Sequence, residues 1–215
     1  MKKVYEYSHL GGTEILKLRY PEIESQIDAV IADIKDVPKP KLSKEKTKAD
    51  RMLYSPVWLN GAFRSRLNAY GFNELKLFFQ VELPNYPVVI KNAYKQIDFV
   101  KDRVLVEVQF GKYAFMFYDM AKFQYFFNEE KADVGVEIVP CRGLQRDMSS
   151  GVAYGEQLVG DILRLRRHFP SVPVKVILID VDSAAPLGEK EIEALSEDEV
   201  LEASEGRDSA QRMAE

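Results

Sequence analysis

Hydrophobic residues recur along the chain with two different spacings, which predict helices in some segments and strands in others. In residues 21–36, isoleucine and valine recur at helical spacing while acidic side chains take the other positions, so we predict an amphipathic helix that begins at Pro21. Ser55 followed by Pro56 is typical of an N-cap and a first helical position, which predicts a second helix through residue 63.

Strand formers dominate the middle of the chain. Residues 75–83 form one predicted strand, and residues 97–110 resemble a hairpin with its turn at Lys101 and Asp102. The remaining predicted elements are a helix over 113–128, a strand over 134–139, a polar loop over 142–151, a helix over 154–168 and a buried strand over 174–181. This alternation predicts an α/β fold with a central mixed sheet flanked by helices.

One face of the second hairpin strand carries polar side chains. Strand periodicity places Glu107 and Gln109 on the same face, opposite to a row of valines. With a two-residue turn at Lys101 and Asp102, Asp98 pairs with Leu105 and lies diagonal to Glu107 on that face, whereas a three-residue turn would point Asp98 away. We therefore expect two carboxylates to converge near one point.

Two converging carboxylates are typical ligands of Mg²⁺, which completes its shell with water and phosphate oxygens. At such a site Asp98 and Glu107 would be the metal ligands, and Gln109 would orient the attacking water, since a carboxamide does not titrate near neutral pH. Taken alone, this spacing is more often that of a solvated strand face in a charged protein than that of a metal site. The single cysteine and two histidines form no zinc pattern.

Charge divides the chain into two parts. The net charge is -4, but residues 187–215 hold ten acidic and three basic side chains, so residues 1–186 carry a net positive charge. We predict one globular domain over residues 1–186 and an acidic C-terminal tail over 187–215 that is partly disordered or helical. No segment has the roughly 20 apolar residues of a membrane span, and the N-terminus lacks a signal-peptide pattern, so we expect a soluble cytoplasmic protein.

Several blocks of the sequence resemble type II restriction endonucleases of the BglII/BstYI family. These enzymes belong to the PD-(D/E)XK nuclease class, in which this family has glutamine where lysine is usual. The resemblance extends from near the N-terminus to about residue 155 and is most specific over residues 98–112. The matching blocks are Tyr7-Ser8-His9-Leu10, Ser43-Lys44-Glu45-Lys46-Thr47-Lys48, Leu53-Tyr54-Ser55-Pro56-Val57, residues 98–112, Asp133-Val134-Gly135-Val136-Glu137 and Met148-Ser149-Ser150-Gly151.

The resemblance implies a PD-(D/E)XK restriction-endonuclease-like core and a homodimer that cuts double-stranded DNA at a palindrome centred on GATC, leaving four-base 5′ overhangs. It implies Asp98, Glu107 and Gln109 as catalytic residues, with Mg²⁺ held by the two carboxylates. A cognate DNA methyltransferase would protect the host DNA without being a physical partner. Glu82, on the preceding strand, is the candidate for a fourth active-site residue.

The resemblance also places Lys112 and the pair Ser149 and Ser150 where the family reads bases. Lysine donates to guanine O6 and N7 and has no bidentate fit to adenine, so a relaxed outer base pair, RGATCY, is consistent with Lys112. Without the matching blocks, a solvent-facing lysine and a helix N-cap before Tyr154 would be the favoured explanation of these residues.

A lysine-rich segment over residues 39–48 adds Lys44, Lys46 and Lys48 to the candidate DNA contacts. It fits phosphate contacts, an arm that orders around DNA, or a solvated loop equally. Two other functions remain, a structure-specific nuclease of the same class and an inactive DNA-binding relative. The three polar residues on one sheet face argue against the inactive relative and against a structural module.

Overall fold

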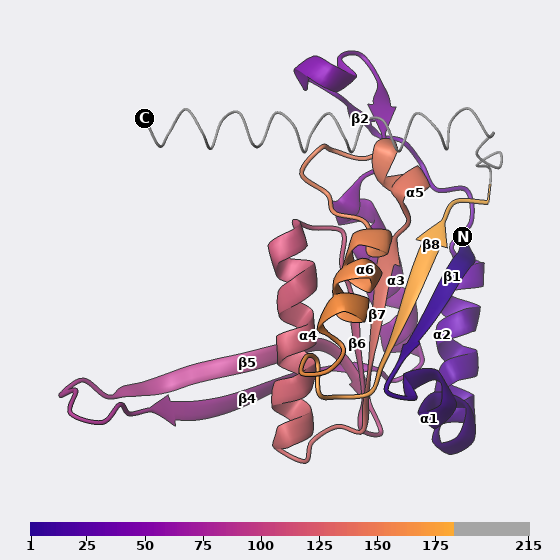
Figure 1. Cartoon of the computed structure of the whole chain (residues 1–215). Coiled ribbons are helices and arrows are strands. Elements are labelled where there is room, and N and C mark those ends of the chain that lie inside the picture. The colour runs from indigo at the N-terminus through magenta and orange to yellow at the C-terminus, as the bar shows by residue number, and fades with distance from the viewer. Residues whose placement is uncertain (183–215) are drawn as a thin grey trace. The chain divides into compact units, whose positions relative to one another are not determined.

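A six-stranded mixed sheet forms the centre of the computed structural model, which describes residues 1–182. The strand order is β1-β8-β7-β6-β5-β4, with β6, β7 and β8 parallel to one another and the outer pairs antiparallel. The predicted acidic tail over residues 187–215 lies outside the described residues. The predicted central mixed sheet flanked by helices is confirmed (Figure 1).

Helices cover both faces of this sheet. Helices α4 and α6 pack against one face, and α1 and α2 pack against the other, where α3 contacts α2. The elements are β1 Lys2–His9, α1 Gly12–Arg19, α2 Pro21–Asp33, β2 Lys41–Leu42, the 3₁₀ turn η1 Lys46–Lys48, β3 Met52–Leu53, α3 Pro56–Ala69, β4 Asn73–Val81, β5 Ile90–Lys101, β6 Val104–Val108, α4 Tyr113–Asn128, β7 Val134–Pro140, α5 Arg142–Arg146, α6 Gly155–Leu165 and β8 Val174–Asp180.

The three parallel strands are buried along nearly their whole length, as expected for a sheet with both faces covered. Their continuous apolar runs explain why the predicted strands over 134–139 and 174–181 agree closely with β7 and β8. Helix α4 has the predicted bounds. The predicted cap of α3 is also present, because the Ser55 side chain accepts a hydrogen bond from the Trp58 backbone N–H, although the helix continues to Ala69.

Several predicted boundaries are wrong. Helix α2 ends at Asp33 rather than at residue 36, and the strand predicted over 75–83 spans Asn73–Val81. The segment predicted as a polar loop over 142–151 begins with helix α5, whose N-cap is Cys141. Cysteine is a weak acceptor, so the sequence carried little sign of this cap.

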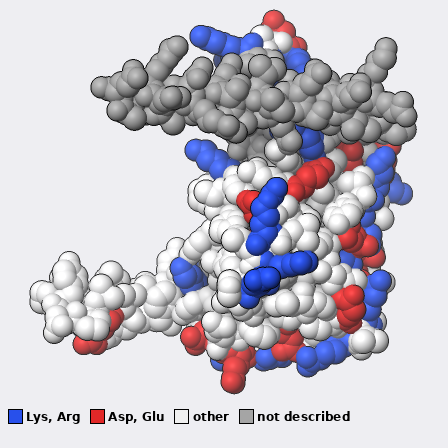
Figure 2. Space-filling view, in the orientation of Figure 1, with Lys and Arg blue, Asp and Glu red and all other residues white. Residues whose placement is uncertain are grey.

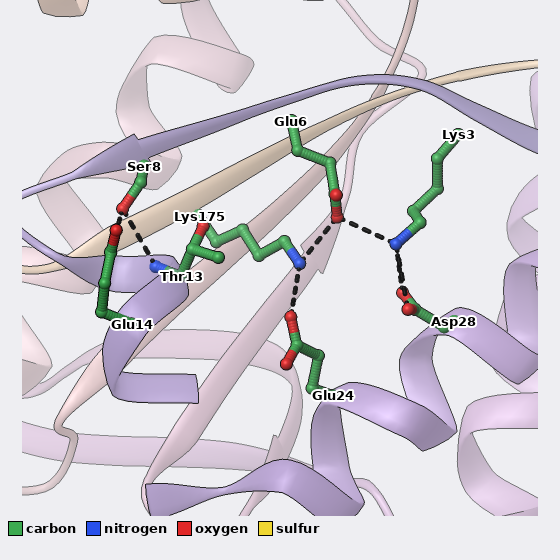
Figure 3. A network of polar contacts seen from close by, with 8 residues as sticks. All are labelled: Lys3, Glu6, Ser8, Thr13, Glu14, Glu24, Asp28 and Lys175. Carbon is green, nitrogen blue, oxygen red and sulfur yellow. Dashed lines mark hydrogen bonds and ion pairs between the residues drawn. The ribbon is translucent and has the colours of Figure 1, made fainter. Parts of the chain in front are cut away.

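Strand β1 and helix α1 were not predicted from the sequence, and polar contacts attach them to the fold (Figure 3). Lys175 on β8 is buried and pairs with Glu6 of β1 at 2.7 Å and with Glu24 of α2 at 2.8 Å. Lys3 pairs with Glu6 and with Asp28 of α2, both at 2.9 Å. Burial raises the pKa of Glu6, but the hydrogen bonds from both lysines outweigh burial and lower it. We call these five residues the β1–α2 network.

The hairpin formed by β4 and β5 extends beyond the strands beside it and projects from the rest of the sheet (Figure 1). Its projecting part is largely uncharged (Figure 2). The exposed apolar residues on this hairpin are Phe78, Leu83, Tyr86, Val88, Val89, Ile90 and Tyr94. No helix among the described residues is long and apolar enough to cross a membrane.

Candidate active site

The turn between β5 and β6 sets the register of the predicted catalytic residues. Lys101 pairs with Val104 and Phe99 with Val106, so the turn residues are Asp102 and Arg103, both with positive φ. The predicted turn at Lys101 and Asp102 is therefore wrong by one position. Because the turn still has two residues, the parity is unchanged and Asp98 keeps the face predicted for it.

When the corrected register is continued by one pair beyond Phe99 and Val106, Asp98 falls opposite Glu107 rather than diagonal to it. The backbone N–H of Asp98 lies 3.4 Å from Oε1 of Glu107. Glu107 is buried, whereas the Asp98 side chain is 36% exposed, and the guanidinium of Arg64 approaches it at 3.9 Å. One carboxylate is thus enclosed by protein and the other is reachable from solvent.

Gln109 directly follows the end of β6 at Val108 and still pairs with the neighbouring strand β7. Its backbone N–H donates to the Ile138 carbonyl at 3.0 Å, and its side-chain Nε2 donates to Oδ2 of Asp119 at 3.0 Å. A Cβ at Gly111 would lie 2.5 Å from Oε1 of Gln109, so the glutamine side chain uses space that only glycine leaves free. The structure therefore brings Asp98, Glu107 and Gln109 together on one face of the sheet.

Three further residues beside this group were missed from the sequence. Glu137 on β7 is the parallel-strand neighbour of Glu107 and is completely buried. Asp119 and Lys122 lie three residues apart on α4 and therefore on one side of that helix. Lys122 Nζ contacts Glu107 Oε1 at 2.5 Å and Asp119 Oδ1 at 2.7 Å.

Negative charge exceeds positive charge in this buried group. Burial, together with the neighbouring Asp119 carboxylate, raises the pKa of Glu107 to about 8 even though Lys122 opposes the change. Burial also raises the pKa of Asp119 and that of Glu137, whose two oxygens are buried without a hydrogen-bond partner. Burial lowers the pKa of Lys122, but the carboxylates outweigh this effect and raise it. An additional cation would relieve the repulsion.

The donor chemistry of this group fits Mg²⁺. Carboxylate oxygens are preferred ligands of this ion, and two carboxylates suffice when water and phosphate complete the shell. Among residues 1–182, no group of three or more His, Cys, Asp or Glu side chains is arranged to hold a metal ion by itself. The residues that fit are Asp98, which solvent reaches, and Glu107, whose ionised form a cation would favour.

An open pocket of about 340 Å³ lies beside Asp98. Asp98 and Lys122 line it, and residues of β5 and α4 complete its wall. The pocket opens to solvent beside Asp98 and Lys122, so an anion can approach the Asp98 carboxylate and the Lys122 ammonium from the same side.

The two predicted base-reading segments lie beside one another. Lys112 is exposed at the N-cap position of α4, and the neighbouring Gly111 carbonyl accepts a hydrogen bond from the backbone N–H of Ala153 at 2.9 Å. Ala153 ends the loop that contains Ser149, half-buried, and Ser150, exposed. The N-cap of α6 is Tyr154, so neither serine caps that helix.

The lysine-rich segment packs against the same serine loop. Lys41 Nζ donates to Ser149 Oγ at 2.5 Å, Lys48 Nζ donates to the Met148 carbonyl at 2.7 Å, and Glu45 accepts from the Ser150 backbone N–H at 3.0 Å. Lys39 and Arg51 both pair with Asp147. Burial lowers the pKa of Lys48. Lys44 and Lys46 are exposed, whereas Lys48 is occupied by the loop.

Glu82 does not join the site. It follows the end of β4, where Val81 pairs with Ile90, and it lies at the outer end of the hairpin with residues 83–87. Asp98 follows Ile97, which pairs with Leu75 of β4, and Leu75 lies about seven residues along the strand from Glu82. The suggestion that Glu82 is a fourth active-site residue is therefore wrong.

A sequence signal for the missed residues did exist. Asp119 and Lys122 are charged residues within a helix that is otherwise rich in aromatic side chains, and Glu137 interrupts an apolar strand run. A charged residue in an apolar run needs a partner or a function, because burying it alone is costly. The sequence could not show that Lys122 of α4 contacts Glu107 of β6, because that contact depends on how the helix packs on the sheet.

Comparison with known proteins identifies relatives by family and by fold. The family model described as restriction endonuclease BglII/BglIII matches residues 4–179. A crystal structure of restriction endonuclease BglII complexed with a DNA 16-mer matches with a TM-score of 0.65 and 20% identity, covering 85% of this chain and 79% of that one. Free BglII matches with a TM-score of 0.59 and 19% identity, covering 86% and 82%. No curated protein sequence matches the chain.

Proposed function

Because the chain belongs to the restriction endonuclease BglII/BglIII family, we propose that it is a Mg²⁺-dependent type II enzyme that hydrolyses double-stranded DNA at a palindrome centred on GATC. The observation that carries the proposal is the proximity of Asp98 and Glu107 on adjacent strands, with Gln109 beyond Glu107 on the same side. Within the family, the sequence blocks favour the BstYI branch.

Cleavage of a phosphodiester requires a nucleophilic water and neutralisation of the charge that develops on phosphorus. Asp98 and Glu107 would hold Mg²⁺, which supplies a water of lowered pKa and offsets that charge. Gln109 contributes hydrogen bonds that orient the water rather than a proton, because its amide does not titrate. The open pocket beside Asp98 gives the phosphate access.

Base reading is assigned to Lys112, Ser149 and Ser150. The hydrogen bond between Gly111 and Ala153 keeps these two segments together, so they can approach one groove of DNA as a unit. Lysine favours guanine through O6 and N7, while a serine hydroxyl donates or accepts and discriminates weakly. This combination favours RGATCY, cut before the central GATC to leave four-base 5′ overhangs.

Lys44 and Lys46 are the lysines best placed to contact phosphates, because both are exposed. Lys48 instead supports the serine loop through the Met148 carbonyl. Replacing both Lys44 and Lys46 by glutamine should weaken DNA binding. It should also make the slope of log affinity against log salt concentration shallower, by the amount expected for the loss of about two phosphate contacts. A titration at several salt concentrations in Ca²⁺ measures this slope, and an unchanged slope would remove both lysines from the interface.

A homodimer is the expected assembly, because a palindrome presents two equivalent half-sites. The β4–β5 hairpin exposes a run of apolar side chains, which is typical of a surface that another chain covers. Replacing residues 83–89 by a short glycine-rich turn should then shift the protein toward monomer in sedimentation experiments. Such an enzyme would act in the cytoplasm, where a cognate methyltransferase protects the host DNA.

The decisive experiment is digestion of a fully sequenced, unmethylated plasmid with Mg²⁺, followed by sequencing of the fragment ends. Discrete cuts with 5′-GATC overhangs would establish the proposal, and the flanking bases would show whether the outer pair is fixed or relaxed. Cutting without sequence preference would favour a structure-specific nuclease instead. Specific binding in Ca²⁺ without cutting in Mg²⁺ would indicate an inactive relative.

A further inference from the structure

The ammonium group of Lys122 links Glu107 to Asp119, and Asp119 in turn contacts Gln109. Lys122 Nζ lies 2.5 Å from Glu107 Oε1 and 2.7 Å from Asp119 Oδ1. The second oxygen of Asp119, Oδ2, accepts a hydrogen bond from Gln109 Nε2 at 3.0 Å. A continuous polar chain thus starts at Glu107, passes through α4 and returns to Gln109.

This chain fixes which end of the Gln109 amide is available. An amide offers a donor at nitrogen and an acceptor at oxygen, and the two ends differ in what they can do for water. Because Nε2 is used by Asp119, the carbonyl oxygen is turned away from that carboxylate and lies over Gly111. Oε1 is therefore the end that remains to accept a hydrogen bond from a bound water.

Lys122 is needed to keep this arrangement, because the carboxylates around it repel one another. Glu107, Asp119 and Glu137 are all buried, and Lys122 is the one lysine or arginine paired with any of these three in the described part of the chain. Removing one partner of a buried ion pair is strongly destabilising, because it leaves the other charge uncompensated. Loss of the ammonium would leave Asp119 and Glu107 free to separate or to take up protons.

We propose that Asp119 and Lys122 are positioning residues of the cleavage site. Lys122 holds the carboxylates of Glu107 and Asp119 in place, and Asp119 in turn orients the Gln109 amide so that its oxygen faces the attacking water. This inference rests on the proposed function, because it assigns to Gln109 the orientation of that water.

A double-mutant cycle between Asp119 and Gln109 tests the proposal. Single-turnover cleavage is measured in Mg²⁺ for the wild type, Asp119→Asn, Gln109→Ala and the double variant. If Asp119 acts through Gln109, each single change should slow cleavage by about 100-fold and the double change by little more than one of them. Multiplicative losses, about 10,000-fold together, would overturn the proposal, because they would mean that Asp119 acts independently.

Lys122→Met tests the ammonium while keeping most of the aliphatic stem. We expect slower cleavage, with specific DNA binding in Ca²⁺ changed by no more than about threefold, because the loss concerns chemistry rather than groove contacts. Lys122→Arg, which can keep both ion pairs, should restore most of the rate. Full cleavage by Lys122→Met, or no recovery with arginine in a folded protein, would overturn the role of Lys122.

Lys175→Met is the matched control. Lys175 is also a buried lysine that bridges two glutamates, but it lies in the β1–α2 network rather than at the site (Figure 3). The Lys175→Met variant should have a lower thermal midpoint of unfolding, and the cleavage rate of the folded variant should equal that of the wild type. If Lys175→Met slows cleavage as much as Lys122→Met does, the effect of Lys122 is merely structural and the proposal fails.

The same assays separate this inference from the proposed function. Absence of specific cleavage by the wild type would refute the proposed function itself. Specific cleavage by the wild type together with multiplicative losses in the cycle would refute only the positioning role. If Asp119→Asn does not fold, the cycle is run with Asp119→Ser and Gln109→Ala, for which the same expectation holds.

Discussion

Glu107→Gln should make the stability of the metal-free protein less sensitive to pH. Burial and the neighbouring Asp119 raise the pKa of Glu107 from 4.5 to about 8 in the folded protein. A group whose pKa is raised on folding contributes stability that is present in full below its unfolded pKa and is lost as pH rises to the folded value. The wild type should therefore lose stability between pH 4.5 and pH 8.

The size of the effect follows from the width of this window. Each pH unit between the two pKa values costs about 1.4 kcal/mol, so the interval from pH 5 to pH 8 corresponds to about 4 kcal/mol. This is a large part of the roughly 5–15 kcal/mol by which natural domains are stable. Glutamine has nearly the same shape and does not ionise, so the variant lacks this loss.

Urea unfolding at pH 5, 6, 7 and 8 in the presence of a chelator measures the difference. The free energy of unfolding of the variant minus that of the wild type should rise with pH. Glu6→Gln is the control, because the pKa of Glu6 is lowered on folding and its contribution is nearly constant over this range. A difference for Glu107→Gln that stays flat within about 0.5 kcal/mol would refute the reasoning.

Two other predictions concern the sheet and the serine loop. Gly135→Ala should lower the free energy of unfolding by about 2 kcal/mol, because its Cβ would lie 2.5 Å from a buried phenylalanine ring. Gly61→Ala has nothing within 4 Å of the new Cβ and should stabilise α3 by up to about 1 kcal/mol. Urea unfolding measures both changes, and equal effects of the two variants would contradict the packing around Gly135. Glu45→Ala removes the acceptor of the Ser150 backbone N–H, so we expect weaker discrimination between the proposed GATC site and a site changed by one base, measured as the ratio of affinities in Ca²⁺. An unchanged ratio would show that the loop does not depend on this contact.

Local patterns predicted the central elements because local and tertiary preferences agree there. The strands over 134–140 and 174–180 are apolar on both faces, and α4 begins directly after the glycine and lysine of residues 111–112. Strand parity also placed Glu107, Gln109 and Asp98 on one face. The turn was misplaced by one residue, because the positive φ angles of Asp102 and Arg103 follow from strand pairing rather than from a glycine signal.

The rest of the site depended on contacts between distant segments. Strand β1 is half exposed at the sheet edge and has no clean alternation, so only its pairing with β8 defines it. Lys122 and Glu107 are brought together by the packing of α4 on the sheet. Likewise, the sequence could not show that Lys48 supports the Met148 carbonyl, while Lys44 and Lys46 stay exposed.

Two buried lysines on this sheet differ in what surrounds them, and the difference separates stability from function. Around Lys175, every carboxylate of the β1–α2 network has a lysine partner (Figure 3). Around Lys122, Glu137 has no hydrogen-bond partner, and burial raises the pKa of Glu107 to about 8. Such unbalanced negative charge lowers stability unless a cation or protons offset it. This unfavourable charge lies beside the open pocket, where the proposed cation-dependent reaction would take place.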